Sequence, residues 1–469
     1  MIHIPPLLIW GQCITFSLLY AVWMIYELLY FRRVLLISGA ILSLYPIYQY
    51  RKYFFQKRAA SFWFMTGLFL WALIHLLFLT YDYPSQLMEL RRIWKYAGLG
   101  AIFALGLGLS LAGSWSIKPN TSQGSQYWPL IYLGLCSPVL IYLLKYALTE
   151  FGPALGLEAP PFLRINSNIN SAYYIPKTDY IAFCLPVLAI SLGQIYSLLN
   201  LHLRLREHQY LEILLYTLAI FSTIFLFYIQ NTKNGIAYAI FCIIFFMALI
   251  LQKASSVKLL SRALFLLGAG VIAITLVYPH LQKNESWRTL IADTRVGFQL
   301  EEYPYWRYAG EKGYPNNEYG TSVSATNYER AAWLKAGVKL VLEHPLGYGL
   351  VEDSFKRMVK FKWPDASTNL SHSHSGWIDL VLGLGFPGLL CILGSIFFSI
   401  RQTRLSEQPW GSLVFWALMA NLMLWMTTEV AATISFSALI FWVSLSSGLT
   451  LIDPAQKISS RSEFPSIDR

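Results

Sequence analysis

Apolar segments of about 20 residues recur along most of this chain, and one long polar stretch, residues 281–374, interrupts them. An α-helix rises ~1.5 Å per residue, so about 20 residues cross the ~30 Å hydrocarbon layer of a membrane. Because lipid offers no hydrogen-bond partner to free backbone groups, we expect each apolar segment to be a membrane-spanning helix. About twelve spans are predicted, at residues 6–29, 34–50, 60–80, 95–114, 129–148, 178–199, 209–229, 233–251, 258–279, 375–400, 410–428 and 430–450.

The basic residues between the spans predict the topology, since positively charged loops stay on the cytoplasmic side. Lys and Arg cluster after the second, sixth, eighth and tenth spans, at Arg51, Lys52, Lys57, Arg58, Arg204, Arg206, Lys253, Lys258, Arg401 and Arg404. Both chain ends are therefore expected in the cytoplasm, and residues 281–374 on the opposite, outer face. Arg32, Arg33, Arg91 and Arg92 break this rule. They either extend to lipid headgroups or take part in a site on the outer face.

The same pattern divides the chain into four parts. Residues 1–280 hold the first nine spans, 281–374 form the outer loop, 375–452 hold spans ten to twelve, and 453–469 form a polar cytoplasmic tail. The N-terminus lacks a basic stretch followed by a cleavage site, so we interpret it as the first span and not as a removed signal.

Composition supports an all-α integral membrane protein. The chain is 56% hydrophobic and 13% charged, whereas a soluble domain has roughly 25% charged residues. The net charge of +11 is explained by the cytoplasmic loops and does not indicate nucleic-acid binding. All five cysteines lie in apolar segments, so the outer loop must be held together by packing and not by disulfides.

The outer loop is predicted to contain a helix of its own. In residues 328–344, Trp333, Val338, Val341 and Leu342 recur at helical spacing, and Pro345 and two glycines follow as a helix stop. Residues 301–324 are rich in Tyr, Gly and Asn and are expected to be irregular. In the tenth span, the LGLGFPG run at 382–388 predicts a kink and close helix packing.

Several reaction classes are excluded by missing motifs. The chain has no phosphate-binding G-x-x-x-x-G-K-[ST] loop, no H-E-x-x-H and no G-x-S-x-G. His372 and His374 are two residues apart, but no Cys or further His accompanies them at close range. A structural zinc site requires four ligands, so neither a metal nor another cofactor is predicted.

Cations and histidines at the margins of the outer loop are the candidate functional residues. Lys233 opens the eighth span, and Arg288, Arg295, Arg307 and Arg330 lie in the loop. Guanidinium and ammonium groups near the headgroup level suit a lipid-linked diphosphate, although such side chains also extend to lipid headgroups without any other role.

Histidine can accept a proton near neutral pH. His374, or alternatively His372, is therefore a candidate base immediately before the tenth span, and Asp379, about one helical turn into that span, is a candidate partner for an imidazole.

Three segments together resemble the O-antigen ligase superfamily. They are TKNG at the start of the eighth span, YERAAWLKAGVKLVLEHPLGYG in the loop, and SHSHSGWIDLVLGLGFPG at the return to the membrane. The resemblance covers roughly residues 209–400. The superfamily includes lipopolysaccharide O-antigen ligases, O-antigen polymerases and oligosaccharyltransferases that glycosylate pilins.

The resemblance implies a GT-C-type glycosyltransferase of the bacterial inner membrane, with about twelve spans and a large periplasmic loop. Such enzymes move a glycan from undecaprenyl diphosphate to an acceptor hydroxyl without a nucleotide sugar or metal. The family's R-x-x-W pattern falls on Arg330 and Trp333, and its H-[NS] motif falls on His374. Lys233 stands where the family usually has arginine. Arg295 or Arg288 would supply a second loop arginine, and the spacing does not decide between them.

The expected function is therefore an inverting, metal-independent transfer of an O-antigen-type glycan. Lys233, Arg330 and Arg295 or Arg288 would bind the diphosphate, and His374 or His372 would act as the base. The preferred acceptor is lipid A-core, which would make the protein an O-antigen ligase. A pilin Ser or Thr is the alternative acceptor, followed by a growing glycan in a polymerase. A transporter of lipid-linked sugars is the alternative from a different class, and it predicts repeat symmetry and more charges inside the spans.

Overall fold

The computed structural model describes residues 4–115, 126–166, 168–201, 207–253, 278, 287–403, 406, 408–428 and 433–452. The regular elements in this part of the chain are all helices, as predicted. Its β-structure is an isolated antiparallel bridge between Asn316 and Ser322. The helices are α1 (Pro6–Val22), α2 (Leu29–Gln49), α3 (Ala60–Ile74), α4 (Tyr83–Glu89), α5 (Lys95–Trp115), α6 (Trp128–Glu150), α7 (Lys177–Leu201), α8 (Glu207–Ile229), α9 (Lys233–Lys253), α11 (Leu290–Gly297), α12 (Ala325–Glu343), α13 (Ser354–Lys362), α14 (Gly376–Gln402), α15 (Trp410–Leu424) and α16 (Thr433–Leu451).

Nine helices within the described ranges are long and apolar enough to cross a membrane, and α1 and α15 are shorter apolar helices. They match the predicted spans in order and approximate position, apart from the span at 258–279. That span, except for Tyr278, and the tail from residue 453 lie outside the described residues. The fold is therefore that of a multi-pass helical membrane protein.

The first predicted span, 6–29, is longer than the helix that forms there. Helix α1 ends at Val22, and after a short 3-10 turn α2 begins at Leu29, earlier than predicted. A side-chain contact accounts for the early end of α1. The Arg32 guanidinium donates a hydrogen bond of 2.6 Å to the Trp23 carbonyl, just past the end of α1. A helix end leaves carbonyls unpaired, and Arg32 satisfies one of them at this turn.

Helix α16 forms the centre of the membrane bundle. Every residue of α16 from Ile434 to Leu451 is buried, and α5 packs along it. A Cβ on Gly448 would lie 2.4 Å from the Leu105 carbonyl oxygen, and one on Gly108 would lie 2.6 Å from that of Leu445. Glycine at both positions lets the two backbones approach closely, which is how helices associate tightly in membranes.

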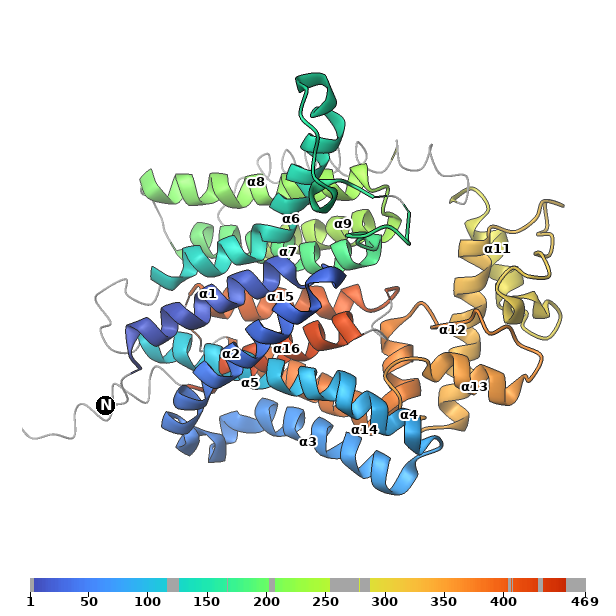
Figure 1. The fold of residues 1–469 in the computed structure, drawn as a ribbon, viewed down its shortest axis with the longest axis horizontal. Coiled ribbons are helices and arrows are strands. Elements are labelled where there is room, and N and C mark those ends of the chain that lie inside the picture. The colour runs from blue at the N-terminus through green and yellow to red at the C-terminus, as the bar shows by residue number, and fades with distance from the viewer. Residues whose placement is uncertain are drawn as a thin grey trace, which may run out of the picture.

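Residues 287–370 form a compact lobe at one end of the bundle, which we call the outer lobe (Figure 1). The lobe has an apolar core of its own, with Trp306, Trp333, Phe355 and Trp363 at its centre. Helix α12 confirms the helix predicted at 328–344 and begins three residues earlier. Between Glu301 and Ser324 the chain forms a 3-10 helix and turns, as expected from its Tyr, Gly and Asn content.

Asp293 organises the polar half of the outer lobe. Its side chain is fully buried and accepts hydrogen bonds from Thr289 Oγ1 at 2.6 Å, Asn317 Nδ2 at 2.9 Å and Asn327 Nδ2 at 3.0 Å. The Ser324 amide, at the start of α12, also donates to it at 3.2 Å. A carboxylate at a helix N-terminus is favourable, so this network joins α11, the irregular segment and α12.

The predicted kink in the tenth span is where the outer lobe joins the membrane bundle. Helix α14 is interrupted at Gly385, where φ is 66°. Pro387 has no N–H group and so cannot donate to the Gly383 carbonyl four residues earlier. The Gly349 amide donates to that carbonyl instead, at 2.7 Å. Likewise, the Tyr348 amide donates to the Leu382 carbonyl at 2.7 Å.

The residues just after α12 are thus bound to the break in α14. The two backbones touch closely, because a Cβ on Gly347 would lie 2.4 Å from the Gly385 nitrogen. His75, just after the end of α3, and Glu89, at the end of α4, contact the same segment: His75 Nε2 lies 3.2 Å from the Gly347 carbonyl oxygen, and Glu89 accepts the Val351 amide at 2.7 Å. Because buried backbone groups must be paired, these contacts fix the lobe relative to α14.

Candidate active site

A cavity of about 310 Å³ lies where the outer lobe meets the membrane helices. The start of α9, helices α11 and α12, the residues before α14 and the residues after α15 contribute to it. Its lining residues are Lys233, Asn234, Ala237, Trp287, Leu290, Thr294, Phe298, Thr326, Asn327, Arg330, Ala331, Leu334, Ser373, His374, Ser375, Met426 and Thr427. The cavity therefore brings together three of the residues predicted from sequence: Lys233, Arg330 and His374.

The TKNG segment forms the tip of the hairpin between α8 and α9. Asn231 adopts a left-handed conformation (φ 50°) and reverses the chain. A Cβ on Gly235 would lie 2.9 Å from the Phe227 ring, so glycine lets the start of α9 pack against the end of α8. This close turn sets Lys233 and Asn234 at the membrane end of the cavity.

Arg330 reaches the cavity from α12. Thr326, Asn327, Arg330, Ala331 and Leu334 line it together, because residues three and four apart share one face of a helix. Arg330 Nη1 donates to Asn234 Oδ1 at 3.3 Å. Asn234 Nδ2 in turn donates to the Thr427 carbonyl at 3.2 Å. Asn234 therefore ties α9, α12 and the segment after α15 together at the cavity.

His374 stacks on Trp333, which lies one helical turn after Arg330. The two ring centroids are 5.1 Å apart and the ring planes differ by 14°. Trp333 is itself fixed, because it is buried and its Nε1 donates to the Trp306 carbonyl at 3.0 Å. The R-x-x-W pattern thus has a physical meaning in this chain: one face of α12 carries the cation and the surface that orients the histidine.

The backbone around His374 is held by Asp379. His374 has a positive φ of 59°, a conformation that costs energy for a non-glycine residue. Asp379 Oδ1, in the first turn of α14, accepts the Ser373 amide at 2.9 Å, and Ser373 Oγ donates to the Ser375 carbonyl at 3.2 Å. The sequence suggested Asp379 as a partner for an imidazole, and the structure shows its hydrogen bond to the amide between the two histidines.

The remaining predicted residues are not among those that line the cavity. His372 is not among the lining residues; its ring packs edge-on against His374 with centroids 4.5 Å apart, and Ser371 Oγ lies 2.7 Å from its Nδ1. Arg295 forms an ion pair with Glu318 on the exposed side of α11. Arg288 is exposed and does not line the cavity.

Arg307, the other candidate loop arginine, packs into the core of the outer lobe. Its guanidinium carbon lies 5.1 Å from the ring centroid of Trp363 and 5.6 Å from that of Trp306. Arginine stacks favourably on aromatic faces, so packing in the core of the lobe explains an arginine at this position without a role in the cavity.

The described lining of the cavity suits an anion. Lys233 and Arg330 contribute positive charge, and no Asp or Glu is among the lining residues within the described ranges. Neutral donors surround the cations, and the apolar side chains of Leu290, Phe298 and Leu334 form one wall. Binding a phosphate here would form charge-assisted hydrogen bonds in a partly dry site, where such bonds are strong.

Residues 218–393 match the family model described as O-Antigen ligase. The resemblance to the O-antigen ligase superfamily is confirmed. No curated protein matches the chain. The match includes Lys233, Arg330 and His374, and therefore the cations and the histidine of the cavity. The O-antigen ligase family supports a ligase- or polymerase-type function, and hence a glycosyltransferase-like membrane enzyme.

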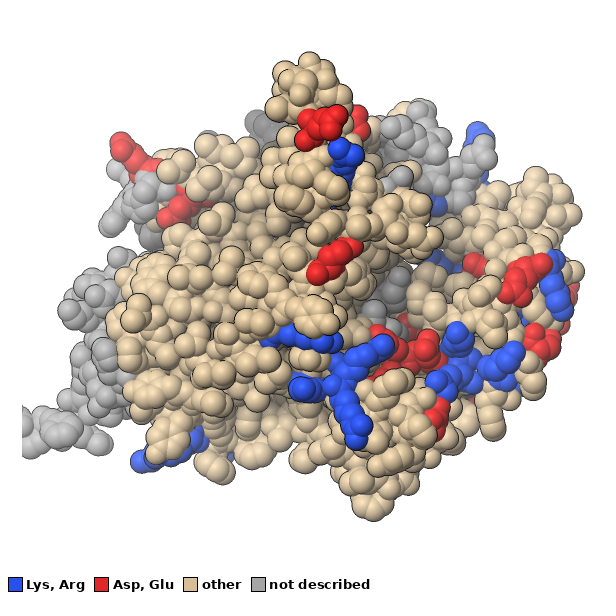
Figure 2. All heavy atoms as spheres, in the orientation of Figure 1, with Lys and Arg blue, Asp and Glu red and all other residues tan. Residues whose placement is uncertain are grey.

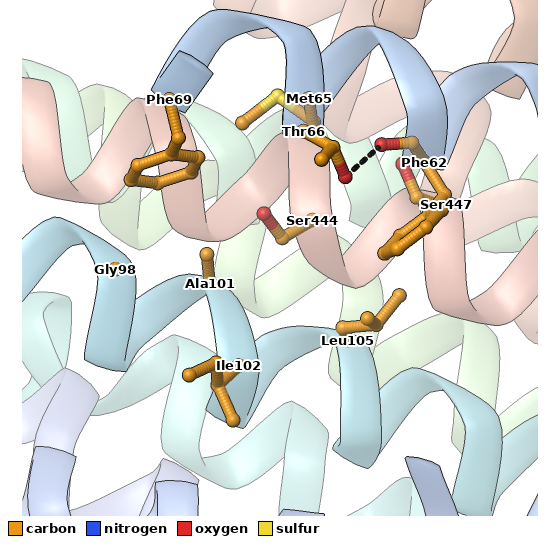
Figure 3. A pocket seen from close by; sticks show the side chains of 10 residues that line it. All are labelled: Phe62, Met65, Thr66, Phe69, Gly98, Ala101, Ile102, Leu105, Ser444 and Ser447. Atoms are coloured by element: carbon orange, nitrogen blue, oxygen red, sulfur yellow. Dashed lines mark hydrogen bonds between the residues drawn. The ribbon is translucent and has the colours of Figure 1, made fainter. Parts of the chain in front are cut away.

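A second cavity, within the membrane bundle, lacks the groups for such chemistry. It has about 280 Å³ and lies between α3, α5 and α16 (Figure 3). Its ten lining residues are apolar or carry only hydroxyl groups, and Thr66 donates its hydroxyl proton to the Phe62 carbonyl. In the part of the chain that the structure describes, no group of three or more His, Cys, Asp or Glu side chains could hold a metal.

Sequence reasoning missed two residues that position the site. Asn234 lies inside the TKNG segment, and its place next to a predicted cation was the only available signal. Tyr238, one turn later on α9, donates its hydroxyl proton to the Leu424 carbonyl at 3.0 Å and accepts the Thr427 amide at 3.2 Å. Both residues hold the segment after α15, which no spacing in the sequence connects to α9.

Proposed function

We propose that this protein transfers an O-antigen-type glycan from undecaprenyl diphosphate to an acceptor hydroxyl on the outer face of the membrane. The acceptor we propose is lipid A-core, and a pilin Ser or Thr is the alternative. The assignment to the GT-C class, to the bacterial inner membrane and to a periplasm-facing site belongs to the same proposal. The observation that carries it is the single cavity in which Lys233, Arg330 and His374 meet.

In the proposed reaction, the imidazole of His374 accepts the proton of the acceptor hydroxyl. The acceptor oxygen forms a bond to the anomeric carbon of the glycan, while the bond from that carbon to the diphosphate oxygen breaks. The electron pair of the broken bond stays on undecaprenyl diphosphate, which gains one negative charge. Displacement from the opposite side inverts the anomeric centre, and neither a metal nor a nucleotide takes part.

The cations supply what this step needs most. Charge develops on the leaving diphosphate, and fixed cations near that charge are often the largest source of catalysis. Lys233 and Arg330 both line the cavity, one from a membrane helix and one from the outer lobe.

The stacking partner supports the assignment of the base to His374. Of the two candidate histidines, His374 lines the cavity, while His372 is not among the lining residues and packs edge-on against His374. Trp333 and the Asp379–Ser373 hydrogen bond fix the position and the backbone of His374. A base must lie within hydrogen-bond reach of the proton that it takes, so the fixed, cavity-lining histidine is the better candidate.

The experiment uses the purified full-length protein with undecaprenyl-diphosphate glycan, and offers lipid A-core and a pilin peptide separately. We expect transfer to lipid A-core that EDTA does not change. His374→Ala should lower kcat by about 10²–10⁴-fold, the usual contribution of a general base, whereas His372→Ala should cause a smaller loss. Transfer to the pilin peptide alone would replace the proposed acceptor, and wild-type rates for His374→Ala would refute the assigned base.

A further inference from the structure

A third cavity, of about 410 Å³, lies on the same side of the membrane bundle as the outer lobe. Residues from the ends of α1, α2, α5 and α16 and from the lobe line it. They are Trp23, Tyr26, Leu29, Arg32, Arg33, Leu36, Arg92, Tyr96, Glu352, Thr433, Ile434 and Ser437. We call it the arginine cavity. It contains three of the four arginines that contradict the positive-inside rule.

The arginine cavity carries an excess of positive charge. Its described lining has three guanidinium groups and one carboxylate, that of Glu352. Glu352 pairs with Arg92 and also accepts Thr433 Oγ1 at 2.7 Å. Outside the lining, Asp179 at the start of α7 interacts with Arg32 and with the Tyr26 hydroxyl, and Glu89 at the end of α4 interacts with Arg92. The excess of positive charge therefore belongs to the lining itself, where Glu352 is the acid among three arginines.

Arg33 is the arginine best placed to receive a ligand. Its guanidinium carbon lies 4.7 Å from the ring centroid of Tyr96, a stacking contact that holds the side chain in the cavity. Its Nε is buried and makes no hydrogen bond to any described residue. Arg32, by contrast, is buried and already donates to the Trp23 carbonyl. A buried donor without a partner costs free energy, and a bound anion would remove that cost.

The surroundings of the arginine cavity favour a ligand that is anchored in the membrane. Beside Arg33, the outward face of α2 exposes Tyr30, Val34, Ile37 and Ile41, which suits contact with lipid chains. The cavity itself combines arginines with the apolar walls of Trp23, Leu29 and Leu36. Basic side chains gather on this face where α2 and α5 approach the outer lobe (Figure 2).

Residues close together in the sequence line the two charged cavities. Met426 and Thr427, which follow α15, line the His374 cavity, and Thr433 and Ile434, which begin α16, line the arginine cavity. No histidine lines the arginine cavity within the described residues, so it can hold a substrate but offers no comparable base. Two cationic cavities on one face, each suited to an anionic group, match a reaction between two membrane-anchored substrates.

We propose that the arginine cavity binds a phosphate group on a glycolipid acceptor, while the donor diphosphate occupies the His374 cavity. The proposal rests on the proposed function and adds where the acceptor is held. It favours a phosphorylated glycolipid over a pilin peptide, because a guanidinium cluster recognises phosphate oxygens and a Ser or Thr hydroxyl carries no such charge.

The test measures binding and transfer separately, with the full chain in phosphatidylcholine nanodiscs. The ligands are lipid A-core with its phosphates, the same molecule after phosphatase treatment, and phosphatidylglycerol as a bulk anionic lipid. We compare the wild type with Arg33→Gln, with Arg33→Lys, which keeps the charge, and with Arg91→Gln. Arg91 is exposed, adjacent to Arg92 and outside the cavity lining, so Arg91→Gln is the matched control.

Arg33→Gln should weaken binding of phosphorylated lipid A-core roughly tenfold and raise its KM by a similar factor, as loss of a charge-assisted hydrogen bond predicts. Arg33→Lys should retain most of the affinity, and Arg91→Gln should behave as the wild type. Phosphatase treatment should weaken wild-type binding and abolish the difference between the wild type and Arg33→Gln.

Two outcomes would overturn the proposal: equal binding by the wild type and Arg33→Gln, or phosphatidylglycerol binding as tightly as lipid A-core with the same dependence on Arg33. Failure of the proposed function looks different. In that case no transfer occurs with any acceptor, while Arg33-dependent binding of the phosphorylated glycolipid persists.

Discussion

Replacing Asn234 by aspartate should damage the enzyme more than replacing it by alanine, although aspartate is nearly the same shape. Asn234 Oδ1 accepts a hydrogen bond from Arg330 at 3.3 Å. A carboxylate in that place would form an ion pair with Arg330 and would compete with the donor diphosphate for its charge. Alanine only removes the contact and leaves the positive charge available.

The distance from Arg330 Nη1 to Asn234 Oδ1 sets the expected magnitudes. At 3.3 Å, two unit charges attract by about 5 kcal/mol at an effective dielectric constant of 20. Because Arg330 is only partly buried, water screens the pair, and we retain roughly 2 kcal/mol. This predicts about a 30-fold loss of kcat/KM for Asn234→Asp. The hydrogen bond removed in Asn234→Ala is long, so about 1 kcal/mol, or roughly fivefold, is expected.

Both variants lose the hydrogen bond from Asn234 Nδ2 to the Thr427 carbonyl, so that loss cancels in the comparison. The assay is the initial rate of glycan transfer at varied concentrations of the undecaprenyl-diphosphate donor. Asn316→Asp adds the same charge at an exposed position of the outer lobe outside the cavity lining, and it should act like the wild type. If Asn234→Asp is as active as Asn234→Ala, Arg330 does not bind the diphosphate through the charge assigned to it.

Two further predictions concern the outer lobe. Gly349→Ala should destabilise it, because the new Cβ would lie 2.0 Å from Gln86 Nε2; the melting temperature should fall, at a cost of about 1–3 kcal/mol for overpacking, well beyond the fall for Gly313→Ala. Gly313 has a similar positive φ with no atom within 4 Å of its Cβ position, so equal shifts for the two variants would contradict the packing argument. Burial raises the pKa of Glu329 above its usual 4.5, while the Tyr314 hydroxyl donates to its carboxyl and opposes the shift. A raised acid pKa means that the folded state binds more protons, so this group's contribution to stability falls as pH rises from 4.5 through the raised pKa. Glu329→Gln should therefore raise the melting temperature at pH 7 and leave it nearly unchanged at pH 4, and a lower melting temperature at pH 7 would refute this explanation.

The membrane helices could be predicted from the sequence because their signal is local. An apolar segment near 20 residues long has few alternatives to crossing the bilayer, and each described span lies close to its predicted position. The exception at the end of α1 has a tertiary cause, the hydrogen bond from Arg32 to the Trp23 carbonyl. Helix α12 was likewise visible as an apolar periodicity followed by Pro345.

The candidate site was predictable only in part. Lys233, Arg330 and His374 stand out because charged and titratable side chains are costly to place at a membrane margin, which indicates a functional role. The direction in which a side chain points is not a local property. Arg295 is as cationic as Arg330, yet it faces Glu318 on the exposed side of α11. Each residue along a helix rotates the side-chain direction by about 100°. Whether an arginine reaches the cavity therefore depends on which face of its helix meets the cavity, and the sequence does not show where the cavity is.

The glycine pattern shows why two distant motifs of this chain depend on each other. The HPLGYG end of the loop motif and the LGLGFPG run of α14 bind each other through backbone hydrogen bonds that the break at Gly385 leaves available. Arg330 and Trp333 precede the first motif on α12, and His374 precedes the second on the chain leading into α14. The contact that anchors the lobe therefore also sets the distance between the phosphate-binding cation and the base. A change at this contact, such as Gly349→Ala, should lower transfer activity without touching any lining residue of the cavity.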